Sequence, residues 1–324
     1  MRSQTTDHSL KNPPNDEERE GSRVEMWISS QPVDQPSHWS GVWATTDVQR
    51  SVRALVEGHD PVHRLLRRLV QGLRPGRALD HGCGFGRVGI YMAAQGWDVV
   101  GVDLSHPGLM EARSQTRDVS FISGDVRTLP FEDEAFDCVV SIGVIEHLQE
   151  GPSLGLQELA RTLREGGRAL ITVPQDNLWR RTIAKLARHL ASSWLLGCAA
   201  ARIPPPSRLP EGFYQYSFRL DEFAPLLAKS GLQVDFHSHY GISHGLAETR
   251  VGAAGEAAAR RRFGGTDVTP KSAVSASRSP LRMEITRRLR AVYDETGDDA
   301  LSQAYIRVLG PLFGHMMAFV VTKR

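Results

Sequence analysis

The sequence has no long apolar run. Its longest weakly polar stretch covers residues 190–201 (LASSWLLGCAAA), whereas a membrane-spanning helix needs about 20 apolar residues. Two interpretations of this stretch stay open: a core or lid helix, or an amphipathic helix that rests on a membrane or shelters a hydrophobic substrate. The first residues also lack the apolar segment of a signal peptide. We therefore expect no transmembrane segment, weak peripheral membrane contact at most, and a cytoplasmic location.

Cysteine is scarce, and neither charge sign dominates. The three cysteines, Cys83, Cys138 and Cys198, are far apart and form no CxxC pair, which argues against a disulfide framework and a zinc site. A formal net charge of +2 does not indicate a nucleic-acid partner unless the basic residues are concentrated in one patch. The composition, with 40% apolar residues in 324, is typical of a globular intracellular protein with a sizeable core.

Large aliphatic residues are rare at the start of the chain. Residues 1–23 are polar, rich in Pro, Asn and Asp, and carry both charge signs. We expect residues 1–40 to form a disordered or irregular tail. Trp27, Trp39 and Trp43 lie in or just after this segment and either anchor it to the core or close over a ligand. Residues 41–324 are expected to form the main domain.

Glycine, in contrast, is concentrated after the first expected strand, residues 77–80. The turn contains three alternating glycines, Gly82, Gly84 and Gly86. Such glycines permit positive φ and let a ligand lie on the backbone, and the helical pattern over 87–95 directs free N–H groups toward the turn. Asp103 ends the next strand, 19 residues after Gly84, which is close to the spacing of about 20 that places an acid against ribose hydroxyls. The stretch predicts a nucleoside-containing ligand.

The rest of the chain alternates expected strands and helices. Strands are predicted over 119–122, 136–142, 168–173, 232–240 and 315–322, and helices from Pro61 and over 106–116, 154–163, 177–201, 221–229, 281–293 and 300–308. Gly166 and Gly167 are predicted to end the helix over 154–163. This alternation indicates an α/β fold with a Rossmann-like, doubly wound sheet whose strands hold the ligand at their carboxyl ends.

The glycine turn alone suits two enzyme classes. Residues 84–89 (GFGRVG) satisfy the GxGxxG pattern of dinucleotide-dependent dehydrogenases, which by itself is a weak signal. A second acid, Asp125, follows the third expected strand. An adenine ring there can donate its exocyclic amine to this carboxylate, whereas a dehydrogenase has no general need for an acid at this place.

Four segments resemble the successive motifs of class I S-adenosylmethionine-dependent methyltransferases. They are ALDHGCGFG, VVGVDLS, ISGDVRTLPFEDEAFDCVVSIGVIEHL and LREGGRALITVP, and they are most similar to the ubiquinone-biosynthesis-like group that acts on small molecules. The resemblance implies seven strands, mostly parallel, with an antiparallel last strand beside the sixth and helical lid insertions. Residues 174–217 and 241–312 would be the acceptor-side insertions.

The resemblance also implies the cofactor, S-adenosyl-L-methionine, with S-adenosyl-L-homocysteine as product. Asp103 would take both ribose hydroxyls with Leu104 packed on the adenine, and Asp125 with Val126 would meet the adenine edge. Other implied contacts lie at the glycine turn and the end of the fourth strand: Asp80, Gly82, Cys83, Gly84, Ser141 and Ile142. His81 departs from the small or aliphatic residue that is usual at its position.

No metal is expected. Gly143 stands where relatives with an ExxEH metal cluster have the first Glu, which leaves only Glu146 and His147. His237 and His239 form an HxH pattern on an expected strand, where histidines on one face are more often structural than ligands.

Catalysis by methyl transfer from a sulfonium needs alignment and a dry pocket, and it needs a general base only if the acceptor loses a proton. His147 is the leading candidate for that base, with Glu146 beside it. The competing interpretation is that both residues only shape the following helical turn. Tyr214, Tyr216 and His244 lie in segments expected to cover the acceptor.

Three functions stay open. The sequence favours methylation of a small-molecule acceptor, such as a natural-product, quinone-like or lipid precursor, in secondary metabolism. The alternatives are an NAD(P)-dependent oxidoreductase and a non-catalytic, cofactor-binding interaction protein. Monomer and homodimer are both compatible with the sequence.

Overall fold

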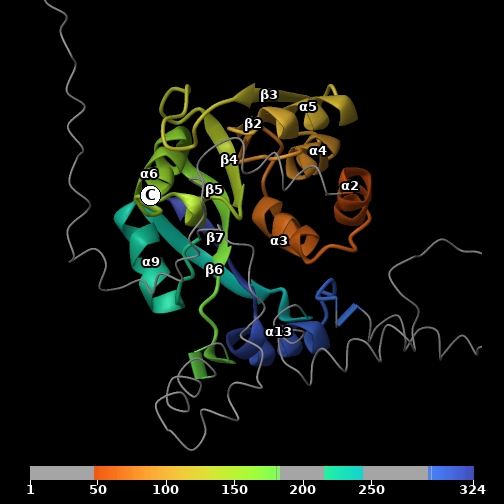
Figure 1. Cartoon of the computed structure of the whole chain (residues 1–324), viewed down its shortest axis with the longest axis vertical. Coiled ribbons are helices and arrows are strands. Elements are labelled where there is room, and N and C mark those ends of the chain that lie inside the picture. The colour runs from red at the N-terminus through yellow and green to blue at the C-terminus, as the bar shows by residue number, and fades with distance from the viewer. Residues whose placement is uncertain (1–46, 180, 183–214, 244–290, 293) are drawn as a thin grey trace, which may run out of the picture.

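A seven-stranded sheet forms the centre of the computed structural model, which describes residues 47–179, 181–182, 215–243, 291–292 and 294–324 (Figure 1). The strands are β1 (Arg77–His81), β2 (Asp98–Asp103), β3 (Val119–Ser123), β4 (Phe136–Ile142), β5 (Leu163–Pro174), β6 (Leu232–Tyr240) and β7 (Met316–Lys323). Their order is β3-β2-β1-β4-β5-β7-β6. Only β7 pairs antiparallel, with β5 and with β6. The expected doubly wound sheet and the antiparallel last strand are confirmed.

Helices cover both faces of this sheet (Figure 1). They are α2 (Val48–Val56), α3 (Pro61–Val70), α4 (Arg87–Ala94), α5 (His106–Gln115), α6 (Ser153–Thr162), α9 (Leu220–Lys229) and α13 (Ala300–Phe313), with a short 3₁₀ turn, η2 (Ile145–His147). One buried apolar cluster joins the sheet to α3, α4 and α5, and a second joins it to α6 and α9. The carboxyl ends of the parallel strands are therefore held between two cores.

The helix α3 begins as the sequence predicts. Its N-cap is Asp60, whose carboxylate accepts from Val62 N at 2.8 Å, and proline occupies the first turn. Leu65, Leu66 and Leu69 are almost fully buried, and burial stabilises such a side chain by about 1.5–3 kcal/mol. This packing positions α3 under β5 and β7, next to the C-terminal part of the chain.

The prediction that Gly166 and Gly167 end a helix was wrong. The helix α6 ends at Thr162, whose hydroxyl donates to the carbonyl of Glu158 at 2.9 Å, and β5 starts directly at Leu163. The pairing of β4 with β5 contains a register shift here, and Gly166 has φ +70°. These glycines therefore serve an irregularity within the strand rather than a helix cap.

The segment after β5 starts and ends at the same place in the fold. Asp176 N donates to the carbonyl of Phe218, and Phe218 N donates to that of Pro174, each at 2.9 Å. Tyr216 N also donates to the carbonyl of Glu146 at 2.8 Å. The returning chain is thus tied to the carboxyl ends of β4 and β5.

Several predictions fall outside the described residues. They concern the tail and its tryptophans (1–46), most of the helices expected over 177–201 and 281–293, Tyr214 and His244, and most of the proposed insertions. The division into tail, domain and insertions therefore stays a prediction.

Candidate functional site

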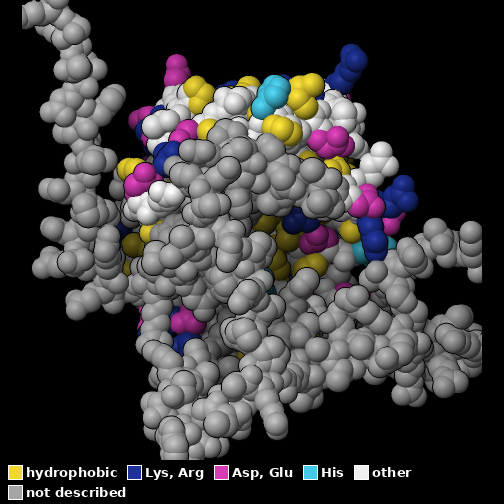
Figure 2. Space-filling model, in the orientation of Figure 1, with side chains coloured by type: hydrophobic (Ala, Val, Ile, Leu, Met, Phe, Trp, Pro, Cys, Tyr) yellow, Lys and Arg dark blue, Asp and Glu magenta, His cyan; other side chains and the backbone are white. Residues whose placement is uncertain are grey.

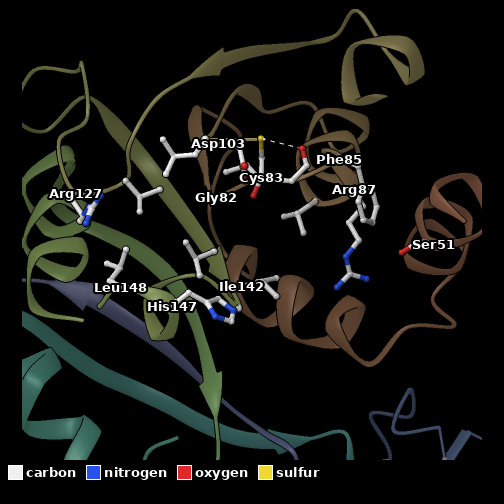
Figure 3. Close-up of a pocket in the computed structure, with 17 residues that line it drawn as sticks. Ser51, Gly82, Cys83, Phe85, Arg87, Asp103, Arg127, Ile142, His147 and Leu148 are labelled. Atoms are coloured by element: carbon white, nitrogen blue, oxygen red, sulfur yellow. Dashed lines mark hydrogen bonds between the residues drawn. The ribbon is translucent and has the colours of Figure 1, made fainter. Parts of the chain in front are cut away.

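A pocket of about 330 Å³ opens at the carboxyl ends of β1, β2 and β4 (Figure 3). Its lining consists of Ser51, Asp80, Gly82, Cys83, Gly84, Phe85, Arg87, Val88, Asp103, Leu104, Val126, Arg127, Ile142, Gly143, Val144, His147 and Leu148. The volume lies within the range typical of small-ligand sites, about 300–1,000 Å³. Nine residues predicted from the sequence are brought together here: Asp80, Gly82, Cys83, Gly84, Asp103, Leu104, Val126, Ile142 and His147.

The glycine turn needs glycine for two separate reasons. Gly82, Gly84 and Gly86 have φ values of +77°, +53° and +77°, a region that L side chains rarely adopt. A Cβ on Gly82 would lie 2.5 Å from a methyl of Val144, and one on Gly86 would lie 2.6 Å from the ring of Phe121. The turn therefore lies tightly against Val144, in the loop after β4, and against Phe121 on β3.

Internal acceptors occupy amide groups of this turn. Gly82 N and Cys83 N donate to the carbonyl of Val102 at 2.9 and 3.0 Å, and Gly84 N donates to Oδ2 of Asp103 at 2.8 Å. A phosphate at a helix N-terminus is bound by free N–H groups. These three N–H groups already donate to acceptors within the protein, so they are not available to bind a pyrophosphate.

Asp103 ends β2 and lies beside Cys83 in the pocket (Figure 3). Its other oxygen, Oδ1, accepts from Ser105 N at 2.7 Å. Each oxygen keeps a further lone pair and can still accept from a hydroxyl. Burial raises the pKa of Asp103, although its bonds to backbone N–H groups act in the opposite direction. The carboxyl group is thus fixed in orientation before any ligand binds.

Asp80 is the second carboxyl group of the lining and is only 5% exposed. Its Oδ2 accepts from Gly89 N at 2.8 Å. A Cβ on Gly89 would lie 3.3 Å from that oxygen, so glycine lets α4 approach. Burial raises the pKa of Asp80 to about 7, and the nearby Asp103 adds to the rise. A cationic group in the pocket would favour the ionised form.

Asp125 does not line the pocket, whereas Arg127 does. Asp125 accepts from Arg127 N at 2.8 Å, from Nε at 3.0 Å to both oxygens, and from Nη2 at 2.7 Å. Arg127 also donates to Glu150 at 3.1 Å. Burial alone would raise the pKa of Asp125, but its hydrogen bonds with Arg127 lower that pKa overall. The adenine-edge role of Asp125 stays a prediction.

Sequence reasoning missed Arg127, Arg87 and Ser51. Figure 3 shows Arg127 on one side of the pocket and the other two residues on the opposite side. Arg87 begins α4 and pairs with Asp60, the N-cap of α3. The sequence signal that could have identified Arg127 is its position two residues after Asp125, a predicted site acid. No local signal identifies Ser51, because α2 reaches the pocket only through tertiary packing.

At the end of β4, Ile142 lines the pocket but Ser141 does not. The Ser141 side chain is fully buried, with Oγ 3.1 Å from Nδ1 of His81. The predicted contact of Ser141 with a cofactor therefore stays a prediction.

His147 lines the pocket from η2, whereas Glu146 lies behind it. Nε2 of His147 is 3.9 Å from Oε1 of Glu146. Oε2 of Glu146 has no hydrogen-bond partner within the described residues. Burial raises the pKa of Glu146 to about 8, so at neutral pH this carboxyl group is mostly protonated.

Tyr216 does not reach the pocket lining. Its hydroxyl donates to the carbonyl of Gln149 at 2.8 Å, which places the phenol over the loop after η2. A catalytic role for Tyr216 stays a prediction without support from this geometry.

The described part of the chain contains no group of three His, Cys, Asp or Glu side chains that could hold a metal ion. Nδ1 of His239 is 2.8 Å from Oε1 of Gln175, and burial lowers the pKa of His239 to about 4. No described helix is long and apolar enough to cross a membrane. On the face shown in Figure 2, acidic and basic side chains of the described residues are interspersed.

A family model described as "Methyltransferase domain" matches residues 79–171, which include β1 to β4 and most of β5. Residues 79–171 of the chain therefore form a methyltransferase domain. This match and the strand order confirm the resemblance found in the sequence motifs. The methyltransferase domain contains all the pocket residues except Ser51.

Curated relatives share this domain. A demethylmenaquinone methyltransferase of Beutenbergia cavernae is 33% identical over 147 residues, which cover 44% of this chain and 59% of the relative. The enzyme of the same name from Mycobacterium sp. (strain KMS) is 34% identical over 149 residues, 44% of this chain and 61% of the relative. A malonyl-[acyl-carrier protein] O-methyltransferase of Erwinia pyrifoliae is 36% identical over 108 residues, 32% and 41%. The chain thus spans less than two thirds of these relatives.

Among solved structures, a TehB-like SAM-dependent methyltransferase from Corynebacterium glutamicum has a TM-score of 0.45 and 17% identity, covering 89% of this chain and 98% of that one. The fold follows from the strand order of the sheet itself.

Proposed function

We propose that this protein transfers a methyl group from S-adenosylmethionine to a small-molecule acceptor by in-line displacement. The observation that carries the proposal is the polar lining of the pocket, where Asp80 and Asp103 flank a glycine turn whose amide groups are bonded internally. Such a lining offers acceptors to hydroxyl and ammonium groups. When bound, the cofactor would supply an electrophilic methyl group on a sulfonium.

Different residues of the pocket would contact different parts of the cofactor. Asp103 would accept from the ribose hydroxyls, and Asp80 would pair with the ammonium group. Leu104 and Val126 line the pocket with apolar side chains suited to an adenine face, and Asp125 would meet the adenine edge once Arg127 releases it. Gly82 and Gly84 would leave the backbone open to close approach.

His147 would act where the acceptor must lose a proton. It lines the pocket from η2, and its side chain is 10% exposed, so it can face an acceptor without being open to bulk water. A neutral imidazole there could take a proton from a hydroxyl acceptor. Glu146, mostly protonated, would not compete for that proton at neutral pH.

The acceptor side of the pocket favours an apolar molecule. Ile142, Val144 and Leu148 line it close to His147. Because two relatives are named as demethylmenaquinone methyltransferases, we propose a quinone-like or similarly apolar precursor, as a natural product or lipid precursor would be. A role in secondary metabolism, a cytoplasmic location and a monomeric or homodimeric state belong to the same proposal.

An NAD(P)-dependent oxidoreductase is the weaker alternative. A pyrophosphate needs free N–H groups at the glycine turn, whereas Gly82, Cys83 and Gly84 donate to internal acceptors. The carboxyl groups of Asp80 and Asp103 would also repel it.

Calorimetry with S-adenosylhomocysteine tests the proposal. Asp103→Ala should weaken binding by at least about 100-fold, because two hydrogen bonds to a charged group contribute at least about 1.5 kcal/mol each. Asp98→Ala is the matched control, since Asp98 is exposed at the opposite end of β2.

Equal binding by the Asp103→Ala variant, or tight NAD(H) binding without competition by S-adenosylhomocysteine, would contradict the proposal. A wild-type protein that binds S-adenosylhomocysteine but methylates nothing in a broad panel of apolar acceptors would favour the non-catalytic alternative.

A further inference from the structure

His81 joins two elements beneath the pocket. It ends β1 and is fully buried. Its Nδ1 lies 3.1 Å from Oγ of Ser141 on β4, and its Nε2 lies 3.3 Å from the carbonyl oxygen of Val126, in the loop after β3. In the sheet, β1 lies between β4 and β2, with β3 beyond β2. The imidazole therefore spans from β4 to a loop that starts three strands away.

The partners of the ring determine its tautomer. The carbonyl of Val126 can only accept, so Nε2 must carry the proton and donate it. Nδ1 is then an acceptor, and the Ser141 hydroxyl donates to it. Burial lowers the pKa of His81 to about 4, so the ring is neutral across the physiological range. Both ring nitrogens are satisfied in this one tautomer.

The carbonyl held by His81 belongs to a wall of the pocket. The side chain of Val126 lines the pocket, as does Arg127 next to it. On the other side of His81, Gly82 begins the glycine turn and also lines the pocket. One residue thus connects the turn with the wall across from it through a side chain that lies outside the lining.

We propose that His81 is a positioning residue that holds the Val126 wall at a defined distance from the glycine turn and so sets the affinity for the adenosine part of the cofactor. This inference rests on the proposed cofactor. A wall held by a buried hydrogen bond loses no mobility when the ligand binds, so less affinity is spent on ordering it. Without the ring donor, the Val126 carbonyl would be buried without this partner, and the loop would shift to satisfy it.

Two substitutions at His81 separate this role from simple core packing. His81→Leu keeps the approximate volume but removes both hydrogen bonds. His81→Gln retains an N–H donor that can reach the Val126 carbonyl. We expect S-adenosylhomocysteine to bind the Leu variant about tenfold more weakly, as for one lost buried hydrogen bond, and the Gln variant within about threefold of wild type. In turnover assays, KM for S-adenosylmethionine should rise while kcat at saturation changes little.

His239→Leu is the matched control. His239 is also a largely buried histidine of depressed pKa, but it bonds to Gln175 near α13. This substitution should lower the free energy of unfolding and leave the affinity for S-adenosylhomocysteine unchanged. A merely structural role of His81 would give it the same profile as His239.

The outcomes are distinguishable. If the wild-type protein does not bind S-adenosylhomocysteine, the proposed function itself fails. If the wild type binds and His81→Leu binds equally well, only the role of His81 is overturned. Should the Leu variant not fold, His81→Asn replaces it, since its shorter amide can reach Ser141 but not Val126. Wild-type affinity in the Asn variant overturns the inference, as does an Nδ1–H tautomer in ¹⁵N spectra of the histidines.

Discussion

The carboxyl groups at the carboxyl edge of the sheet fall into two kinds, one in each half of that edge. In the half formed by β1 and β2, Asp80 and Asp103 each accept from backbone N–H groups at 2.7–2.8 Å. In the half that leads into β5 and β6, Glu146 and Glu295 are buried, and one oxygen of each has no partner within the described residues. The carboxyl groups of the first half are thus fixed by local backbone N–H groups, whereas burial raises the pKa of both carboxyl groups of the second half.

Long-range contacts dominate the second half. Arg64 on α3 is 5% exposed and donates to the carbonyl of Glu295 at 3.0 Å, to Oγ of Ser238 at 3.2 Å and to the carbonyl of His239 at 2.8 Å. Glu295 in turn accepts from Ile242 N at 2.6 Å. This half therefore depends on residues that are far apart in the sequence, whereas the cofactor half depends on neighbours.

The largest effect is expected at Arg64. Arg64→Met removes three hydrogen bonds from a buried site and should lower the free energy of unfolding by about 3–5 kcal/mol, as for breaking a buried polar cluster. Urea denaturation measures this loss. Arg67→Met, one turn away on α3, breaks only an exposed ion pair with Asp298 and should cost about 0–1 kcal/mol. Affinity for S-adenosylhomocysteine should survive in the folded fraction of both variants; its loss in the Arg64 variant alone would mean that the two halves are coupled.

The next effect concerns Glu146 and pH. Its pKa is raised from 4.5 to about 8, so the folded state favours the protonated form, and this stability is present below pH 4.5 and lost as pH rises through 8. Glu146→Gln removes the titrating group. Between pH 5 and 8 the variant should therefore lose less stability than wild type, by up to about 1.4 kcal/mol per pH unit. If the unfolding free energies of wild type and the Glu146→Gln variant changed in parallel with pH, the raised pKa of Glu146 would be refuted.

Asp80 should make cofactor affinity depend on pH. Its pKa is about 7 in the ligand-free pocket, and only the ionised form pairs with an ammonium group. Affinity for S-adenosylhomocysteine should rise by up to about tenfold per pH unit below 7 and level off above it. Asp80→Asn should bind more weakly, with a flat profile over the same range. An unchanged slope in that variant would assign the titration to another group.

The smallest effect is expected at Arg127. Because both oxygens of Asp125 already accept from this side chain, a ligand must displace it to reach them. Arg127→Met should therefore bind S-adenosylhomocysteine about threefold more tightly, as for about half a kcal/mol. Glu150→Gln, which removes the second carboxylate that pairs with Arg127, should weaken binding slightly. Weaker binding by Arg127→Met would mean that the guanidinium contacts the cofactor itself.

How far the site could be predicted follows the same division. The limits of β4 and β6 and the start of α3 agree with the sequence prediction. These features depend on residues that are adjacent in the chain, so a sequence pattern can identify them. The pattern failed at Gly166 and Gly167, since glycine ends helices and bends strands alike, and the pairing of β5 with β4 decides between the two.

By itself, the sequence determined the α/β fold, the glycine turn and the acid at the end of β2, because their spacing along the chain specifies local backbone geometry. Only the tertiary structure decided which acids open onto the pocket. Asp80 and Asp103 do, whereas Asp125 is taken up by Arg127 and Glu146 lies behind His147. The tertiary structure also decided that His81, an unusual residue in a familiar motif, forms hydrogen bonds both to β4 and to the loop after β3. The physical reason is that burial and hydrogen-bond partners arise from chain segments that meet only in the folded protein.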